Sequence, residues 1–413
     1  MQFSDILDQD YVKEKLVQMV QHNRLSHSLL FLGKEGSGDL SLAIAFAQYI
    51  VCTSSKKQKS NLTYDSLFND QTENLVLSNN NLLAVDSCGT CPACLKAAKL
   101  MHPDIHFSYP VINKKAGEKP VSSDFIREWR EYIASYPYGN VFDWLQFIGA
   151  ENKQGNISSE ECNDIIKKLS LKSFESNFKI LIMWLPEYLG KEGNKLLKLI
   201  EEPPTDTIFI FVSENEQSIL PTILSRTQLV KIPILTDQVL KDGLVTRANI
   251  SEDKAVQIAG ISNGNYRAAL QLLQHAEEDW QELAREWLRI INRKLLSEQV
   301  KWLEDMSKLG REKQKQFLLY FIHLCEHAVR LRVLEESNSS EQNSVVLGIP
   351  EIERDFALRL NKLCSLEAQE TIIEELTKCC YYIERNANSK MMFHALSIRL
   401  YYIIKDNSLI LVN

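Results

Sequence analysis

Short apolar runs alternate with amphipathic stretches through the first half of the chain. Residues 179–184 and 207–212 are apolar at nearly every position, which is typical of strands buried on both faces of a parallel sheet. Shorter strand patterns lie at residues 28–32, 105–109 and 229–233. Helical spacing of apolar side chains separates these runs, for example over residues 158–171. Strands that alternate with helices predict a doubly wound α/β domain.

From about residue 236 the pattern is helical to the end of the chain. Trp280, Leu283, Trp287 and Ile291 recur at helical spacing, and similar apolar faces follow. We therefore predict an all-helical region after the α/β domain.

Two stretches fit neither pattern. Residues 53–87 are polar with little periodicity, which is typical of a long loop. Residues 112–157 contain a predicted helix at 124–135 and an aromatic segment at 136–147. We treat both stretches as inserts and assign no function to either.

Composition limits the class of protein. The 413 residues are 45% hydrophobic and 24% charged, as in ordinary globular proteins, and they suffice for two or three domains. The sequence shows neither a signal-peptide pattern nor an apolar run of membrane-spanning length, so we expect a cytoplasmic protein without a membrane role. Because the net charge is −7, any contact with DNA should be local or shared with partners.

A glycine-rich turn after the first predicted strand resembles a phosphate-binding loop. Gly33 and Gly38 occupy the two glycine positions of G-x-x-x-x-G-K-[ST], with Gly36 between them. The lysine that neutralises phosphate is replaced by Asp39, and the hydroxyl that ligates magnesium is replaced by Leu40. The loop is therefore degenerate, and ATP binding is not expected; alternatively, the stretch is only a turn.

The cysteines predict a metal site. Cys88, Cys91 and Cys94 form C-x-x-C-x-x-C, and Cys52 ends the helix after the glycine-rich loop. Four thiolates at such spacing suit a tetrahedral structural zinc ion. His102 could compete as a ligand, but a turn or packing role fits it better. The remaining cysteines are expected to be small core residues: Cys162, Cys325, Cys364, Cys379 and Cys380.

The order of these motifs resembles one family. Leu-Leu-Lys-Leu-Ile-Glu-Glu-Pro-Pro at residues 196–204 lies between the two long apolar runs, and Leu-Ser-Arg follows at 224–226. With the glycine-rich loop and the cysteine cluster, this order resembles the subunits of the bacterial DNA polymerase III clamp loader, and most closely the delta-prime type. The resemblance is clear over residues 3–52, 88–110 and 158–275, and loose over the C-terminal helices.

The resemblance implies a fold and a domain organisation. Clamp-loader subunits have an AAA+ ATPase fold, which predicts an α/β P-loop-type core with a small helical lid and an all-α C-terminal collar domain. We expect the core at residues 1–235, with a zinc-binding module at 52–94. The lid is then expected at 236–275, and the collar, which would mediate oligomerisation, at 276–413.

The resemblance also implies that the chain does not hydrolyse ATP. The acidic pair that would bind magnesium at the end of the 179–184 strand falls on Trp184 and Leu185, which cannot ligate a metal. Glu187 is a possible substitute, although we expect it to be a solvated loop carboxylate. Two parts of the ATP site are thus missing.

Two arginines have counterparts in the family. Arg226 matches the arginine of a Ser-Arg-Cys motif, with Thr227 in place of the cysteine. The match implies an arginine finger that acts in trans on ATP bound by a neighbouring subunit. Arg267 matches the sensor-2 position, where we expect a structural contact between lid and core.

We therefore predict a non-hydrolysing, delta-prime-like subunit that is a scaffold and arginine donor during ATP-driven loading of the sliding clamp on primed DNA. The implied partners are the delta and tau/gamma subunits, and the clamp and primer–template DNA through the complex. The alternatives are an ATPase with a divergent phosphate loop and an independent zinc-containing DNA-binding protein.

Overall fold

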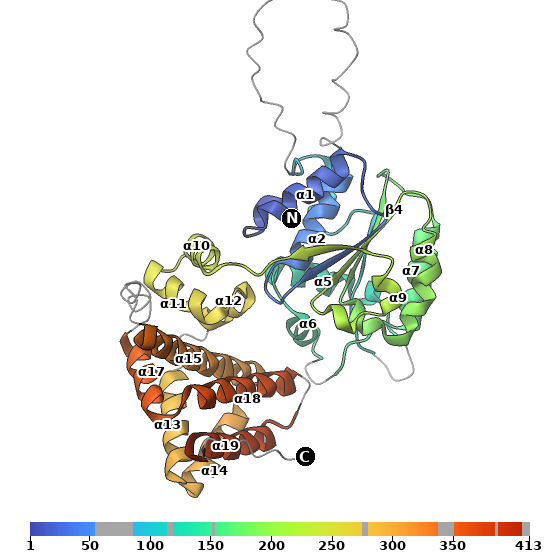
Figure 1. The fold of residues 1–413 in the computed structure, drawn as a ribbon. Helices are drawn as coiled ribbons and strands as arrows, with labels where there is room; N and C mark the ends of the chain where they lie inside the picture. The colour runs from blue at the N-terminus through green and yellow to red at the C-terminus, as the bar shows by residue number, and fades with distance from the viewer. Residues whose placement is uncertain are drawn as a thin grey trace, which may run out of the picture. The chain divides into compact units, whose positions relative to one another are not determined.

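The computed structural model describes residues 1–53, 86–113, 119–150, 153–274, 280–337, 351–384 and 387–406. Nearly all of the insert predicted at 53–87 lies outside these residues. The chain forms two compact units (Figure 1). One comprises Met1–Gly243 with Gly264–Arg267, and the other comprises Leu244–Asn263 with Ala268–Asn413. Within the described residues, no helix is long and apolar enough to cross a membrane.

A five-stranded parallel sheet forms the centre of the first unit, in the order β2-β3-β4-β1-β5. The strands are β1 (Ser28–Gly33), β2 (Ile105–Ser108), β3 (Lys179–Trp184), β4 (Thr207–Ser213) and β5 (Gln228–Ile232). Each lies where an apolar run predicts it. The three central strands are almost wholly buried, because helices cover both faces of the sheet.

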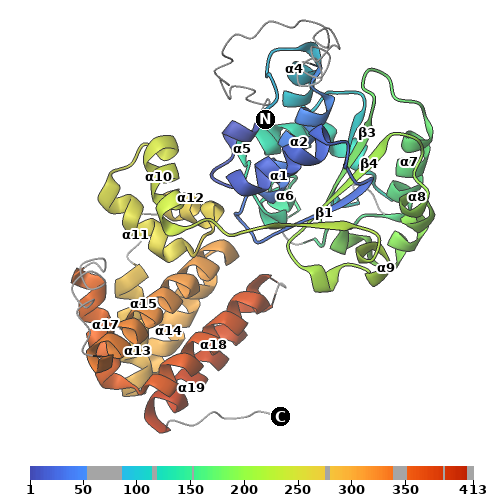
Figure 2. The ribbon, with the colours of Figure 1, turned by 45° about the horizontal axis from the view of Figure 1, so that its top comes forward.

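Alternate side chains of the strands enter two separate hydrophobic clusters. Phe31 and Ile182 join the cluster with α1 (Asp10–Gln21), α2 (Asp39–Val51), α4 (Pro92–Ala98), α5 (Ile126–Ser135) and α6 (Val141–Phe147). Leu30 and Leu181 join the cluster with α7 (Ser159–Ser170), α8 (Leu197–Glu201) and α9 (Pro221–Leu224). Figures 1 and 2 show these two groups of helices on opposite faces of the sheet. The predicted doubly wound α/β core is thereby confirmed.

The stretch at 112–157 is part of the core. It forms η3 (Ser122–Phe125), α5 and α6. Five of its aromatic side chains are buried, whereas Tyr136 and Phe147 are exposed; the buried ones are Phe125, Trp129, Tyr132, Tyr138 and Trp144. Trp129 stacks on Tyr109 with ring centroids 3.9 Å apart, and its centroid lies 5.3 Å from that of Trp184 on β3. Trp144 Nε1 donates a 2.7 Å hydrogen bond to the carbonyl of Pro110. Burial of these large rings fixes the segment against the carboxyl end of β3.

The segment after β3 is only partly α-helical. Residues Pro186–Leu196 form η4, a 3₁₀ segment interrupted at Gly190 (φ 51°, ψ −139°), and only α8 is α-helical. Gly193 packs closely on Leu220, where an added Cβ would lie 2.8 Å from Leu220 Cδ1. Such a close approach favours glycine over any larger residue.

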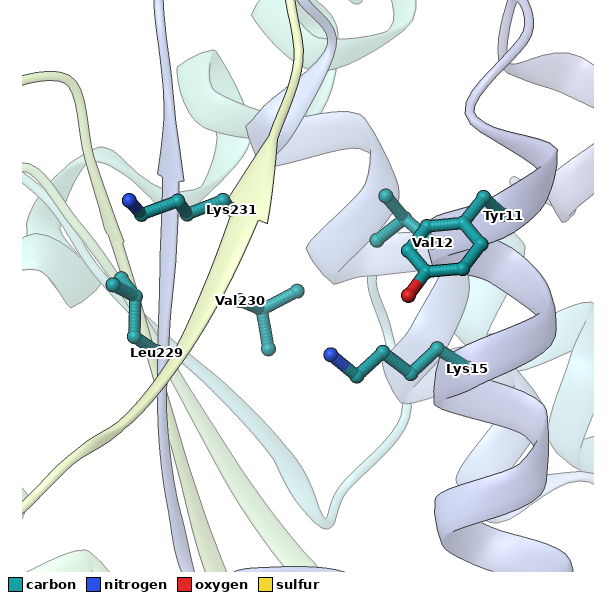
Figure 3. A pocket seen from close by; sticks show the side chains of 6 residues that line it. All are labelled: Tyr11, Val12, Lys15, Leu229, Val230 and Lys231. Atoms are coloured by element: carbon teal, nitrogen blue, oxygen red, sulfur yellow. The ribbon is translucent and has the colours of Figure 1, made fainter.

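A groove lies beside the edge strand β5 (Figure 3). It has a volume of about 270 Å³. Helix α1 and strand β5 supply its lining residues, which are Tyr11, Val12, Lys15, Leu229, Val230 and Lys231. Tyr11 is 76% exposed, so this edge of the sheet presents an aromatic ring and two lysines to solvent.

In its described residues, the second unit has helices as its only regular secondary structure. Its helices include α11 (Glu252–Ser262), α13 (Trp280–Arg293), α14 (Leu296–Lys308), α15 (Arg311–Ser337), α17 (Glu351–Leu363), α18 (Leu366–Glu384) and α19 (Ser389–Asp406). Trp287 stacks on Trp302 at 4.8 Å and donates a 2.9 Å hydrogen bond to Ser397 Oγ. Helices α10 (Asp237–Ala248) and α12 (Tyr266–Gln274) each have residues in both units.

Candidate functional site

The degenerate phosphate loop joins β1 to α2. Gly36 (φ 74°) and Gly38 (φ 86°) adopt left-handed backbone conformations, which glycine adopts without steric cost. Gly38 caps α2, whose first residue is Asp39. The loop therefore keeps the backbone turn of a phosphate site.

Asp39 is enclosed in the loop. Its Oδ1 accepts a 2.8 Å hydrogen bond from the Leu40 N–H, and its Oδ2 is buried without a hydrogen-bond partner among the residues that the structure describes. Burial raises the pKa of Asp39 to about 7, the Leu40 hydrogen bond lowers it, and the charges of Glu187 and Glu35 raise it further. These carboxylates make the position unfavourable for phosphate.

Two segments from elsewhere in the chain lie against the glycines of the loop. A Cβ added at Gly38 would lie 2.8 Å from the Tyr138 ring, and one at Gly36 would lie 2.0 Å from Asn265 Oδ1. The Leu7 N–H donates a 2.9 Å hydrogen bond to the Tyr138 hydroxyl. The Ser41 hydroxyl donates to the carbonyl of Pro137. The chain itself therefore occupies the space beside the loop.

Arg267 is held by two carboxylates. Its Nη2 donates to Asp143 Oδ1 at 2.6 Å, its Nε donates to Asp143 Oδ2, and its Nη1 donates to Glu35 Oε1 at 2.8 Å. The Arg267 side chain is only 5% exposed. Asp143 lies in a capping box with Asn140, which fixes the start of α6. This bidentate pair joins the 264–267 turn to the 112–157 segment.

The carboxyl end of β3 has no carboxylate of its own. Trp184 and Leu185 are both buried in the core. Glu187 accepts a hydrogen bond from the Ser213 hydroxyl, and its other oxygen is buried without a partner. Burial raises the pKa of Glu187, against the hydrogen bonds that it accepts. The expectation of a solvated loop carboxylate was therefore wrong, because the neighbouring β4 end folds over Glu187.

Arg226 lies between α9 and β5. Its guanidinium forms an ion pair with Glu201, and its Nη1 donates to the carbonyl of Thr222 at 2.8 Å and to Ser225 Oγ at 3.0 Å. The Arg226 side chain is 36% exposed. The structure thus places Arg226 on the surface, where its partners Glu201, Thr222 and Ser225 lie outside the phosphate loop.

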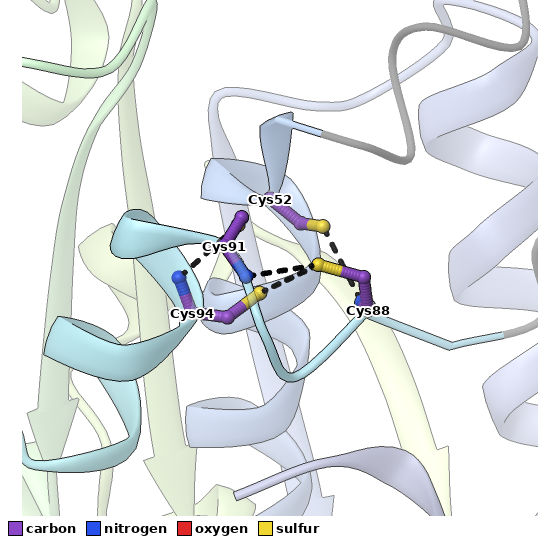
Figure 4. Close-up of side chains that lie close together, drawn as sticks. All are labelled: Cys52, Cys88, Cys91 and Cys94. Carbon is purple, nitrogen blue, oxygen red and sulfur yellow. Dashed lines mark hydrogen bonds between the residues drawn. The ribbon is translucent and has the colours of Figure 1, made fainter.

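The four predicted cysteines lie together (Figure 4). Their sulfurs are all within 4.8 Å of one another, and the sulfurs of Cys88 and Cys94 are 3.9 Å apart. A tetrahedral zinc ion with Zn–S bonds of about 2.3 Å separates its sulfurs by roughly 3.8 Å. The N–H groups of Cys88, Cys91 and Cys94 each donate a 3.4 Å hydrogen bond to another cysteine sulfur, as suits thiolate acceptors.

The cluster can therefore bind a metal ion at the C-terminal end of α2, where Cys52 is the cap. His102 is outside this group, is buried, and accepts a 3.2 Å hydrogen bond from the Asp104 N–H through its Nδ1. The five other cysteines are buried, as expected of small core residues.

Two residues that lie beside the phosphate loop or hold Arg267 there, Tyr138 and Asp143, were not predicted, and neither was the contact of the loop residue Glu35 with Arg267. No motif in the sequence indicates these contacts. The Asn140–Asp143 spacing is a capping signal, so it predicts the start of a helix but not the Arg267 partner.

Comparisons with known proteins agree with this fold and with the motif order. The family described as DNA polymerase III, delta subunit, matches residues 8–67 and 66–236, which is more than half of the chain. DNA polymerase III subunit delta' of Bacillus subtilis (strain 168) is 23% identical over 270 residues, which cover 65% of this chain and 60% of the relative.

DNA polymerase III subunit delta' of Escherichia coli (strain K12) is 23% identical over 278 residues, covering 67% of this chain and 61% of that protein. The chain thus spans about three-fifths of the length of these relatives. A gamma subunit-related protein of Thermotoga maritima is a structural neighbour, with a TM-score of 0.36, 13% identity, and coverage of 95% of this chain and 99% of that one. That score supports no conclusion. From the family match and its delta' relatives, the chain belongs to the DNA polymerase III delta subunit family and is of the delta-prime-like clamp-loader type.

Proposed function

We propose that the chain is a non-hydrolysing subunit of a DNA polymerase III clamp loader. One observation carries the proposal: side chains of this chain occupy the surroundings of its own phosphate loop. Tyr138 and Asn265 lie against Gly38 and Gly36, and Arg267 is already paired with carboxylates. ATP would have to displace packed side chains to reach a loop in which Asp39 replaces the lysine that should follow the second glycine.

The electrostatics of the loop support the same proposal. Glu35, Asp39 and Glu187 supply negative charge where an active site supplies a lysine and a magnesium ion. An alternative ATPase with a divergent loop needs a cation to neutralise the β- and γ-phosphates. Arg267, a buried cation beside the loop, is committed to Asp143 and Glu35.

For Arg226 we propose the role of arginine finger in trans. A guanidinium is always charged and presents a planar fork of donors, which suits charge that develops on a transferring phosphoryl group. Its pair with Glu201 is partly exposed, so the pair contributes little and can be exchanged for a phosphate of a neighbouring subunit.

The domain roles and partners are part of this proposal. Residues 1–235 would be the core, 236–275 the lid, and 276–413 the collar that mediates assembly. The partners would be the delta and tau/gamma subunits, with the sliding clamp and primer–template DNA reached through the complex. The cysteine cluster would hold a structural zinc ion, because four protein ligands leave no open position for substrate.

Calorimetric titration of the full chain with ATP and magnesium tests the proposal, together with co-purification of the chain with the clamp-loader subunits and the clamp. We expect no saturable nucleotide binding at micromolar concentrations, and we expect recovery of the complex. Micromolar affinity with turnover would favour the divergent ATPase. Salt-dependent DNA binding by the chain alone would favour the zinc-containing DNA-binding protein.

A further inference from the structure

Two histidines and a glutamate face one another in the helical unit. His323 and His327 are four residues apart on α15, so they share one face of that helix. Glu353 lies on α17, which packs along α15. His323 Nε2 is 3.6 Å and His327 Nδ1 is 3.4 Å from Glu353 Oε2, and one ligand atom from each residue lies within 4.8 Å of the others.

These distances fit a metal site better than a hydrogen-bonded cluster. Good N–H···O hydrogen bonds span about 2.7–3.2 Å, and both contacts to Glu353 are longer. Nitrogen and oxygen ligands at about 2.0–2.2 Å from a tetrahedral zinc ion lie roughly 3.3–3.5 Å apart. The buried His327 Nδ1 also lacks a hydrogen-bond partner within the described residues.

Burial and charge point the same way. His323, His327 and Glu353 are 4%, 7% and 8% exposed. In the part of the chain that the structure describes, the two histidines are the only ion-pair partners of Glu353. A carboxylate charge that is out of water without a paired metal ion or cationic side chain is costly. A divalent cation bound at this point would neutralise that charge.

The immediate surroundings suit a ligand set that is held in place. The Tyr320 hydroxyl lies 3.5 Å from Glu353 Oε1, the carboxylate oxygen that does not face the histidines. A Cβ added at Gly260 of α11 would meet only His323 Cε1 within 4 Å, at 3.6 Å. The glycine thus leaves space beside the His323 ring.

We propose that His323, His327 and Glu353 form a second metal site, for a divalent transition-metal ion of the zinc class, that joins α15 to α17. The sequence His323-Leu-Cys-Glu-His327 has the H-x-x-E-H spacing found in some zinc proteases. Burial of all three ligands makes this site structural, because substrate cannot reach a metal held there. The proposal is independent of the clamp-loader assignment.

Metal analysis of the full chain, purified from zinc-supplemented medium, tests the site. The parent should carry about one more metal ion per chain than Glu353→Gln or His323→Gln. His394→Gln on α19, an exposed histidine outside the cluster, should keep the metal content of the parent. Cys91→Ser should lose the metal of the cysteine cluster alone, so the two sites are counted separately.

Cobalt titration of the parent tests the site with a measurement that does not depend on the folding of any variant. Cobalt at the cysteine cluster produces thiolate-to-cobalt absorption, whereas cobalt at the proposed site adds visible d–d bands without it. Cobalt at the cysteine cluster has d–d bands of its own, so we expect cobalt uptake and d–d absorption to keep rising after the thiolate-to-cobalt absorption is complete. A metal content equal in the parent and both variants, or cobalt uptake accounted for by thiolate absorption alone, would show that the three side chains are only a buried polar cluster.

Discussion

The two ends of helix α2 differ in whether they keep the residues that their chemistry requires. At its N-terminal end, Gly38 and Asp39 keep the turn of a phosphate loop without its chemistry. At its C-terminal end, Cys52 joins a complete set of four metal ligands. The difference teaches that a backbone scaffold and the chemistry that it carries are separable. The turn also supports the fold of the unit, whereas a metal site with a ligand missing stabilises nothing.

The largest expected effect is at the cysteine end. Cys91→Ser should remove about one zinc ion per chain and lower the melting temperature strongly, because structural zinc contributes about 10–16 kcal/mol of apparent binding energy in zinc-finger peptides. Cys162→Ser, a buried cysteine outside both proposed metal sites, is the matched control and should keep the zinc content of the parent. An unchanged melting temperature and metal content in Cys91→Ser would contradict a metal site at the C-terminal end of α2.

The second prediction concerns Arg226, which would act on ATP bound by a neighbouring subunit while the chain's own phosphate loop binds no ATP. Arg226→Ala should leave the chain folded and able to assemble, and it should slow single-turnover ATP hydrolysis at the adjacent site. Arginine fingers are worth on the order of 10³–10⁵ in rate in GTPase systems. Arg226→Lys should rescue poorly, since an ammonium lacks the planar fork. The exposed Arg127→Ala is the control, and equal rates for Arg226→Ala and the parent would make Arg226 a surface residue.

A smaller effect tests the burial of Asp39. With its pKa raised from 3.8 to about 7, the folded chain binds more protons than the unfolded chain between these values, so the contribution of Asp39 to stability falls as pH rises through this window. Asp39→Asn, which can keep the Leu40 hydrogen bond, should therefore stabilise the chain more at pH 8 than at pH 5.

A change of one unit in pKa corresponds to about 1.4 kcal/mol, so the contribution of Asp39 to the free energy of unfolding should change by at most roughly 4 kcal/mol. Chemical denaturation at the two pH values measures it, with the exposed Glu216→Gln as control. A gain from Asp39→Asn that is the same at both pH values would contradict a buried, titrating carboxyl.

In the last prediction, two substitutions in the phosphate loop are expected to have no effect on ATP affinity. Asp39→Lys with Leu40→Thr restores the missing residues of the phosphate loop, yet we expect no ATP binding below millimolar concentrations while Tyr138 covers Gly38. Adding Tyr138→Ala to this pair should increase the affinity. Tight binding in the pair with Tyr138 in place would show that only the lost lysine and hydroxyl silence the loop. Calorimetry of the two variants makes the comparison.

Much of the α/β unit and the cysteine cluster was readable from sequence. Apolar runs locate β3 and β4 because both faces of these strands are buried. The sequence identifies Cys88, Cys91 and Cys94 as possible metal ligands, because ligands at such short spacing can reach one ion from a single turn. The loss of a lysine at Asp39 is equally local. In each of these cases the sequence signal lies in the same residues that form the structural feature.

Tertiary structure alone decided what surrounds the phosphate loop. Asp143 and Arg267 are 124 residues apart, and neither carries a signal that names the other. The same holds for the α15 histidines and Glu353, and for the aromatic segment that became core. These pairings depend on how whole elements pack, so the physical reason is that long-range contacts between single side chains leave no period or spacing in the sequence.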